Sequence, residues 1–330
     1  MFRQDRTNPS TAVSNWRGRH DTPKAWPSTA VSTWTNGGLF GTAFVATGGI
    51  ITQYVDSGDS KTYRVHAFRG SGKFVVASGE ANVDYLIVAG GGSGGSKAGG
   101  GGGAGGFVTN AGGTPLAVTA ASSPYTITVG VGGANSVDTT NQRDDGDDST
   151  ALGQTATGGG SGGYDGQDGA AGGCGGGGGG KNGTPNTSGG TASQGYDGGE
   201  GVGRTYSDTA PTIAAGGGGG GSAVGSDAHA TSGVAGAGGA GTTHIGITQS
   251  TPTYRGGGGA WGVVTGGAGG SGGGGLGPYG SNLAPATQNG GGGVPNSGSG
   301  GGGGGAAAGT WSNGAGGAGI VLIRYDTGLT

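Results

Sequence analysis

Glycine accounts for 97 of the 330 residues, and several stretches contain almost nothing else. Uninterrupted runs include residues 175–180, 216–221 and 300–305. Because glycine carries no side chain, a hydrophobic core cannot hold these runs, and ordering each residue costs about 1–2 kcal/mol of backbone entropy. Order in such runs therefore has to come from backbone hydrogen bonds and from very close approach of one backbone to another.

Two structures fit this composition. Glycine-rich chains with few apolar residues commonly form flexible linkers or disordered tracts. The alternative is a lattice of polyglycine II helices, which have three residues per turn and direct every amide and carbonyl outward, toward neighbouring helices. Only glycine lets such helices approach closely. Short strand-like segments among the runs favour the ordered lattice, which would be a stiff and uncharged spacer.

Short β-branched and aromatic segments predict strands before, among and after the glycine runs. The expected strands are residues 50–55, 62–68, 73–77, 83–88, 107–109, 125–129 and 320–325. Residues 70–72 predict a hairpin turn, and the apolar segment 320–325 is expected inside a sheet, beside residues 85–88. No window has a helical period. The predicted fold is mainly β, with an antiparallel, jelly-roll-like β-sandwich platform, a bundle of packed polyglycine II helices, and little or no α-helix.

The sequence divides into four regions. These are an N-terminal arm (1–36), a β-strand region (37–90), a glycine-rich region with interspersed strands and loops (91–319) and a C-terminal strand that completes the sheet (320–330). In the arm, the segment from Pro9 to Trp16 recurs almost unchanged from Pro27 to Trp34. Two copies are too few for a solenoid. The arm is expected either to dock on a partner, with Trp16 and Trp34 as anchors, or to lie on its own protein.

Charge and composition exclude several classes of protein. The net charge is −3 and only 10% of residues are charged, so the basic patch of a nucleic-acid binder is missing. No apolar stretch approaches 18 residues, so membrane insertion is not expected. The N-terminus has no apolar segment of the kind found in secretory signals. The single cysteine, Cys174, cannot form an intrachain disulfide and is expected to be a small packed residue.

The sequence contains no convincing catalytic, cofactor or metal site. Dinucleotide-like glycine patterns are abundant by chance and lack the helix that such a site needs. His66 is interpreted as an ordinary strand residue. The acidic segment 144–148 does not have the spacing of an EF-hand, and a solvated loop is favoured over a calcium site. We therefore expect no enzyme activity, no cofactor and no metal.

Aromatic residues between the glycine runs are the candidates for recognition. If the runs form rods, the segments between them are turns at the rod ends, where rigid aromatic side chains suit contacts with sugars or proteins. The alternative is that these side chains cap the lattice or cover the sheet. The candidate receptor-binding residues are Tyr164, Tyr196, Tyr206, Tyr254, Trp261 and Tyr279, and Trp311 belongs to the same set.

Several segments resemble, in the same order, the glycine-rich domains of bacteriophage virion proteins. They are residues 62–74, 83–92, 102–108, 127–133 and 319–325, so the resemblance spans roughly residues 45–326. Proteins that look like this are common in phages of marine bacteria and cyanobacteria, and the expected arrangement of polyglycine II helices is similar to that of tail-fibre adhesins in T-even-like phages.

The resemblance implies a virion structural protein, specifically a tail-fibre or tail-tip component that contacts the host surface. It would assemble in the host cytoplasm and act on the virion outside the cell. The implied partners are other virion proteins, through the N-terminal arm, and a host surface glycan or outer-membrane protein. The alternatives are a non-adhesive virion protein, such as a head decoration or connector, and a non-viral glycine-rich scaffold. A homo-oligomer is compatible with all of these.

Overall fold

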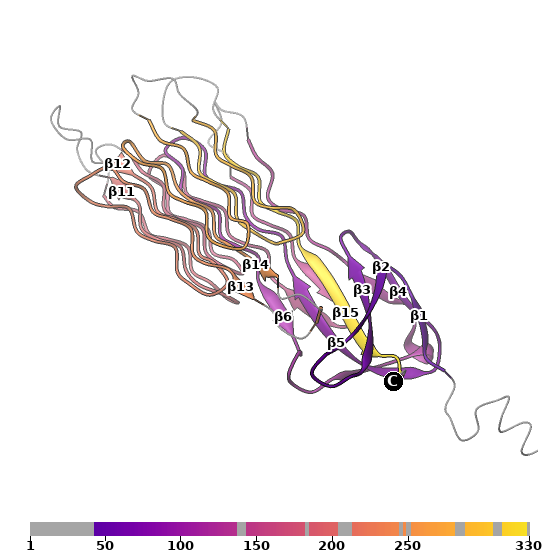
Figure 1. Cartoon of the computed structure of the whole chain (residues 1–330). Helices are drawn as coiled ribbons and strands as arrows, with labels where there is room; N and C mark the ends of the chain where they lie inside the picture. The colour runs from indigo at the N-terminus through magenta and orange to yellow at the C-terminus, as the bar shows by residue number, and fades with distance from the viewer. Residues whose placement is uncertain are drawn as a thin grey trace, which may run out of the picture.

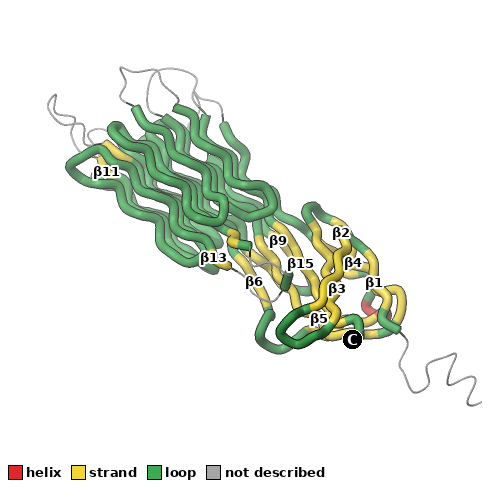
Figure 2. The backbone as a smooth tube through the Cα atoms, viewed as in Figure 1, coloured by secondary structure: helices red, strands yellow, loops and turns green. Residues whose placement is uncertain are grey.

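The computed structural model describes residues 43–136, 143–181, 185–203, 213–243, 247–248, 252–280, 288–305 and 312–328. The larger sheets lie at one end of an elongated molecule, and long backbone segments run side by side from them to the other end (Figure 1). We refer to the end with the larger sheets as proximal and to the other as distal. Figure 2 shows that the distal part consists almost entirely of backbone outside strands and helices.

The described residues form strands and one short 3-10 helix, η1 (Ala120–Ser122), and contain no α-helix. The strands are β1 (Val45–Thr47), β2 (Ile50–Val55), β3 (Thr62–Phe68), β4 (Gly72–Ser78), β5 (Glu80–Val88), β6 (Phe107–Thr109), β7 (Leu116–Thr119), β8 (Tyr125–Ile127), β9 (Ser149–Ala151), β10 (Gln154–Ala156), β11 (Val202–Gly203), β12 (Ile213–Ala214), β13 (Thr242–Thr243), β14 (Thr253–Tyr254) and β15 (Ile320–Asp326).

The strands pair in antiparallel sheets that do not close. A six-stranded sheet has the order β2-β3-β15-β5-β6, with β7 also paired to β5, and a three-stranded sheet has the order β1-β4-β8. The strands β9 and β10, β11 and β12, and β13 and β14 form separate two-stranded pairs. The C-terminal strand β15 lies between β3 and β5, with Ile320 opposite Val88 and Ile323 opposite Tyr85. This position confirms the prediction from its continuous apolar sequence.

The predicted hairpin at residues 70–72 is wrong. Strand β3 belongs to the six-stranded sheet and β4 to the three-stranded sheet, so the two strands do not pair. The intervening residues carry the chain from one sheet to the other. Phe68 before the crossing and Phe74 after it both pack in the core between the sheets. Neither Gly70 nor Gly72 has the positive φ that a two-residue hairpin turn requires.

One hydrophobic core joins the two sheets. It combines residues of the three-stranded sheet, such as Phe74 and Ile127, with residues of the six-stranded sheet, such as Ile87 and Ile323. The alternate residues of β5 and β15 form a second cluster on the opposite face, where Leu86 and Leu322 pack with others. Strands β5 and β15 are therefore apolar on both faces, which explains their nearly continuous hydrophobic sequence.

His66 is a buried strand residue, as its sequence context predicts. Its Nδ1 lies 2.7 Å from the carbonyl oxygen of Gly48, and its Nε2 lies 3.3 Å from the hydroxyl of Tyr325. Because a carbonyl can only accept, Nδ1 carries the proton and Nε2 accepts from Tyr325. The ring also meets Phe74 edge-on, at 5.0 Å between centroids. Burial lowers the pKa of His66, since the charged imidazolium would lose its hydration.

We expect acidification to destabilise the protein through His66. Below pH 6.5 the unfolded chain binds a proton at this residue, whereas the folded chain resists it because its pKa is lowered. The thermal midpoint should therefore fall as the pH drops from 7.5 to 5.5, and the His66→Gln variant should lose much of this dependence. The exposed His229 supplies the control, because His229→Gln should keep the wild-type slope. Equal slopes in both variants would show that His66 does not carry the effect.

The glycine-rich segments are held by backbone hydrogen bonds that repeat every three residues. In segment 99–106, successive amides donate to three different neighbours, and the fourth amide returns to the first neighbour. The segments 157–163 and 298–301 run antiparallel to it, and 216–219 runs parallel. The pairs are Gly100 to Gly163, Gly103 to Gly160 and Gly106 to Thr157; Gly101 to Gly216 and Ala104 to Gly219; Gly102 to Gly301 and Gly105 to Gly298.

The carbonyls of the same segment accept from three further neighbours. These are segments 89–95, 174–177 and 255–258. Segment 99–106 is thus surrounded on all sides by backbone to which it is bonded, whereas a β-strand bonds to two neighbours in one plane. Written from the donating amide to the accepting carbonyl, the pairs are Gly95 to Gly100, Gly92 to Gly103 and Ala89 to Gly106; Gly177 to Gly101 and Cys174 to Ala104; and Gly258 to Gly102.

Aspartates complete this backbone lattice at its surface. The acidic segment 144–148 is exposed and lies outside strands and helices, as expected of a solvated loop, but its backbone also bonds to the lattice. Gly146 donates to Gly159, and the carbonyl of Asp147 accepts from Gly90, so the segment belongs to the lattice. At several places an aspartate carboxylate accepts a hydrogen bond from a backbone amide. The acceptors and their donors are Asp144 from Ala134, Asp145 from Ser161, Asp148 from Gly158, Asp168 from Ser188, Asp197 from Ala192 and Asp227 from Glu200.

Candidate functional site

Tyr164 lies at a distal turn among charged side chains of both signs. The turn places Asp165 beside Lys97 and Lys181, with carboxylate-to-ammonium distances of 3.1 and 3.5 Å. The guanidinium of Arg143 lies 5.8 Å from the centre of the Tyr164 ring. Two lysines therefore lie beside the Asp165 carboxylate, with their side chains about half exposed, and Arg143 lies beside Tyr164 and donates to the carbonyl of Asp168.

The backbone at this turn is unusual. Lys97, Ala98 and Asp165 all have φ between 43° and 52°, a region that side-chain-bearing residues rarely occupy. The amide of Asp165 donates to the carbonyl of Lys97 at 2.9 Å, and Gly180 donates to Ala98 at 2.8 Å. These bonds hold the strained turns together and fix the positions of Lys97 and Asp165. Non-glycine residues in such conformations are frequent at functional sites.

Tyr279 lies at the same end of the molecule and is 59% exposed. The backbone of Tyr279 forms an isolated β-bridge with Gly262, and Gly262 forms another with Ala214 of β12. Strand β12 lies at the distal end (Figure 1). Tyr196 is also exposed, but it lies near the sheets, because the neighbouring Gln194 donates to the carbonyl of Thr155 in β10. The structure thus brings Tyr164 and Tyr279 to the distal end and leaves Tyr196 at the proximal end.

Two other candidates are packing residues. Trp261 is only 2% exposed, so the expectation that it stands on an exposed turn is wrong. It lies inside the lattice, where its amide donates to Gly99 and its carbonyl accepts from Ala215. Tyr254 packs against the cluster on the outer face of the six-stranded sheet, and burial raises the pKa of its hydroxyl. Tyr206, Trp311 and the anchors Trp16 and Trp34 lie outside the described residues.

Sequence reasoning missed the most deeply buried charge in the described residues. Arg255 is fully buried, and its φ is +67°. Its Nε donates to the carbonyl of Gly105 at 2.7 Å, and Nη2 donates to the carbonyl of Gln194 at 3.0 Å and contacts the sulfur of Cys174 at 3.4 Å. The guanidinium also stacks on Phe107, 4.2 Å from the ring centre.

Arg255 therefore ties together the proximal ends of several lattice segments. Burial lowers the pKa of the guanidinium, although arginine keeps its proton in proteins. Its Nη1 has no hydrogen-bond partner among the described residues. Cys174 is buried, as expected, and its thiol donates to the carbonyl of Gly220. The only signal in the sequence is an isolated cation directly before a glycine run, which says nothing about burial.

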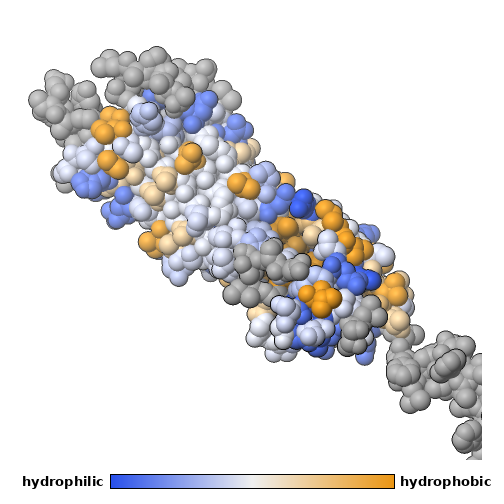
Figure 3. All heavy atoms as spheres, in the orientation of Figure 1, coloured by the Kyte–Doolittle hydropathy of each residue, from blue (hydrophilic) through white to orange (hydrophobic). Residues whose placement is uncertain are grey.

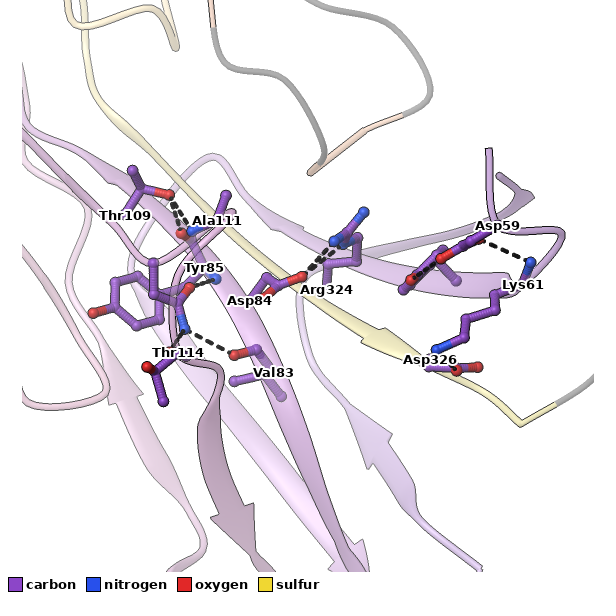
Figure 4. Close-up of polar contacts among 12 residues, drawn as sticks. Asp59, Lys61, Val83, Asp84, Tyr85, Thr109, Ala111, Thr114, Arg324 and Asp326 are labelled. Carbon is purple, nitrogen blue, oxygen red and sulfur yellow. Dashed lines mark hydrogen bonds and ion pairs between the residues drawn. The ribbon is translucent and has the colours of Figure 1, made fainter. Parts of the chain in front are cut away.

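A second polar network lies on the outer face of the six-stranded sheet. Figure 4 shows Arg324 of β15 directed at Asp84 of β5, with Nε 3.1 Å from the carboxylate. Arg324 also donates to the hydroxyl of Tyr54 and lies over the ring of Tyr63, 4.2 Å from its centre. Tyr63 donates to Asp59 at 2.6 Å, and this bond is the main cause that raises its pKa to about 12. Each polar group here has a partner, so the network is structural.

Comparison with known proteins identifies the family. The antiparallel sheets and the backbone-bonded glycine segments define a mainly β protein of the glycine-rich class. A family model described as a glycine-rich domain matches residues 67–326, more than half of the chain, and the chain belongs to this family. No curated protein matches the sequence. Within the described ranges, no cluster of three or more His, Cys, Asp or Glu could hold a metal, and no segment forms an apolar helix of membrane-spanning length.

Proposed function

We propose that this chain is a bacteriophage virion structural protein, a tail-fibre or tail-tip component that contacts the host surface. In this proposal the glycine-rich segments are polyglycine II helices, and they stand on a jelly-roll-like β-sandwich. The observation that carries it is the three-residue repeat of hydrogen bonds in segment 99–106, which bonds to neighbours on all sides. Three residues per turn with no internal hydrogen bonds is the geometry of polyproline II-type helices.

Such a lattice suits a stiff spacer. Each described interior segment is cross-linked to its neighbours by backbone bonds, so bending the body would break many of them together. Backbone hydrogen bonds make most of the described contacts within the lattice, and aromatic and cationic residues lie at its distal turns. Rigid presentation of a few exposed side chains lowers the entropic cost of binding. These features support an adhesive role.

A non-adhesive virion protein is the alternative, and one observation favours it. Trp261 and Tyr254, two of the aromatic candidates, are used for packing within the protein. In a purely structural protein, aromatic residues would serve only to pack the interior. Tyr279, which is exposed, and Tyr164, which is half-buried, both lie at the distal end and distinguish the two proposals.

The double variant Tyr164→Ala, Tyr279→Ala should lose binding to host cells by about tenfold or more, as expected when aromatic anchors are removed. The measurement is sedimentation of purified protein with a panel of marine bacterial and cyanobacterial strains. Tyr196→Ala is the matched control, because it removes an exposed tyrosine at the proximal end and should bind like wild type.

The two proposals give different results in this assay. Wild-type binding to at least one strain that the double variant loses supports an adhesin. Failure of the wild-type protein to bind any strain supports the non-adhesive role. Equal loss in the double variant and in Tyr196→Ala would contradict recognition by the distal end.

A further inference from the structure

Strand β2 is an unprotected edge of the six-stranded sheet. It pairs with β3 along its whole length, and within the described residues no strand pairs with its other side. An open edge offers a row of amides and carbonyls for a further strand, and proteins usually protect such edges with lysine, proline or a bulge. The sequence of β2, Ile-Ile-Thr-Gln-Tyr-Val, has no charge and no proline, and its register with β3 is regular.

Three apolar side chains of β2 are exposed, and they occupy both faces of the sheet. Ile50 is 53% exposed, Ile51 is 46% exposed and Val55 is 59% exposed. Val45 of β1, one two-glycine turn away at the edge of the other sheet, is 46% exposed. Figure 3 shows apolar residues gathered on the end of the molecule that carries the sheets, whereas the lattice surface is mostly pale. Clustered exposed apolar residues of this kind mark interaction sites.

We propose that β2 pairs with β2 of a second copy of this chain and joins two six-stranded sheets into one. The strands would run antiparallel about a two-fold axis perpendicular to the sheet, with Thr52 opposite Thr52 of the other copy. Facing side chains must lie on the same face, so a residue pairs with one at an even separation. Ile50 then lies opposite Tyr54, and the sheet gains aromatic–β-branched and Thr–Thr pairs, which stabilise antiparallel sheets.

A second copy fits this edge by its charge. Residues 50–55 carry no ionisable side chain except the tyrosine hydroxyl, so self-pairing brings no like charges together. Asp56 falls beyond the paired residues, opposite Gly48 of the other copy. The pairing extends an existing ladder, so it needs no rearrangement of the sheet. Antiparallel pairing would direct the two lattices in roughly opposite directions, because the lattice continues from the sheet along its strands (Figure 1). The inference does not depend on the proposed function.

The first test is the molar mass of the full-length protein by light scattering during size-exclusion chromatography at increasing concentration. We expect twice 30.5 kDa for the wild type and a single-chain mass for Ile51→Lys, which adds two charges to the joined edge. Leu276→Lys is the control, since Leu276 is 65% exposed on the lattice, and it should remain dimeric. A single-chain mass for the wild type at every concentration, or a dimer that survives Ile51→Lys in folded protein, would overturn the proposal.

The second test keeps the proposal falsifiable if Ile51→Lys fails to fold. Thr52→Cys should form an intermolecular disulfide under mild oxidation, because the two sulfurs meet at the two-fold axis. Val55→Cys lies on the same strand at a position that is also exposed, but its symmetry mate is six residues away along the ladder, about 20 Å. It should stay unlinked, as should the wild type, whose Cys174 is buried. Equal cross-linking of both variants, or none in Thr52→Cys, would refute pairing through β2.

Discussion

Replacing Gly103 by alanine should lower the free energy of unfolding by about 1–3 kcal/mol, the range for overpacking of a closely packed interior. An added Cβ would lie closer than 3.0 Å to the carbonyl oxygens of Cys174 and Gly175, which real Cβ atoms essentially never do. These neighbours are backbone atoms held by their own hydrogen bonds, so they cannot rotate away as a side chain would. The cost is measured by equilibrium unfolding in urea.

Gly70→Ala is the matched control for this substitution. Gly70 has nothing within 4 Å of its Cβ position, and its φ is not positive. Alanine at such a site leaves stability unchanged or raises it by up to about 1 kcal/mol, because it restricts the unfolded chain. A similar loss in both variants would mean that close backbone packing is not what requires glycine at position 103.

Replacing Arg255 by alanine should be the most destabilising change of a polar residue, at about 3–5 kcal/mol. The buried carbonyl of Gly105 would lose its donor, at a cost of about 1–3 kcal/mol, and the partly buried carbonyl of Gln194 would also lose the bond from Arg255. The stacking on Phe107 would also disappear, and a cavity would remain at the proximal end of the lattice.

The exposed Arg69 serves as the control for Arg255, because Arg69→Ala removes the same side chain from the surface. Its effect should lie within about 0.5 kcal/mol of zero. Urea unfolding of both variants, with circular dichroism to check that each is folded, makes the comparison. If Arg255→Ala were as stable as Arg69→Ala, the buried guanidinium would not be holding the lattice ends together.

The sheets could be predicted from the sequence because their residues carry local signals. Segments 50–55 and 62–68 are β-branched and aromatic, and the structure forms strands with those bounds. The apolar run at residues 320–325 predicted a strand bonded on both sides, and β15 lies between two neighbours. The predicted hairpin at residues 70–72 was wrong, because the glycines do not indicate whether the next strand pairs within the same sheet or belongs to another.

The candidate site was less predictable because its geometry depends on long-range packing. A tyrosine between glycine runs can lie at either end of a segment, and the sequence does not distinguish Tyr164 from Tyr196. Trp261 is buried because the segments around it close over the ring. Arg255 contacts residues about 60 to 150 positions away in the chain, so no local pattern shows its burial. Likewise, the aspartates that accept lattice amides look like ordinary surface charges.

The central claim is that the glycine segments form a lattice with three residues per turn. Hydrogen exchange resolved to single amides in residues 99–106 tests it most directly. Because the described amides of Gly100 to Gly106 each donate to a neighbouring segment, the account predicts slow exchange at every one of these consecutive positions. Alternating fast and slow amides, as at the edge of a β-sheet, or exchange at the rate of an unstructured glycine chain throughout, would contradict it.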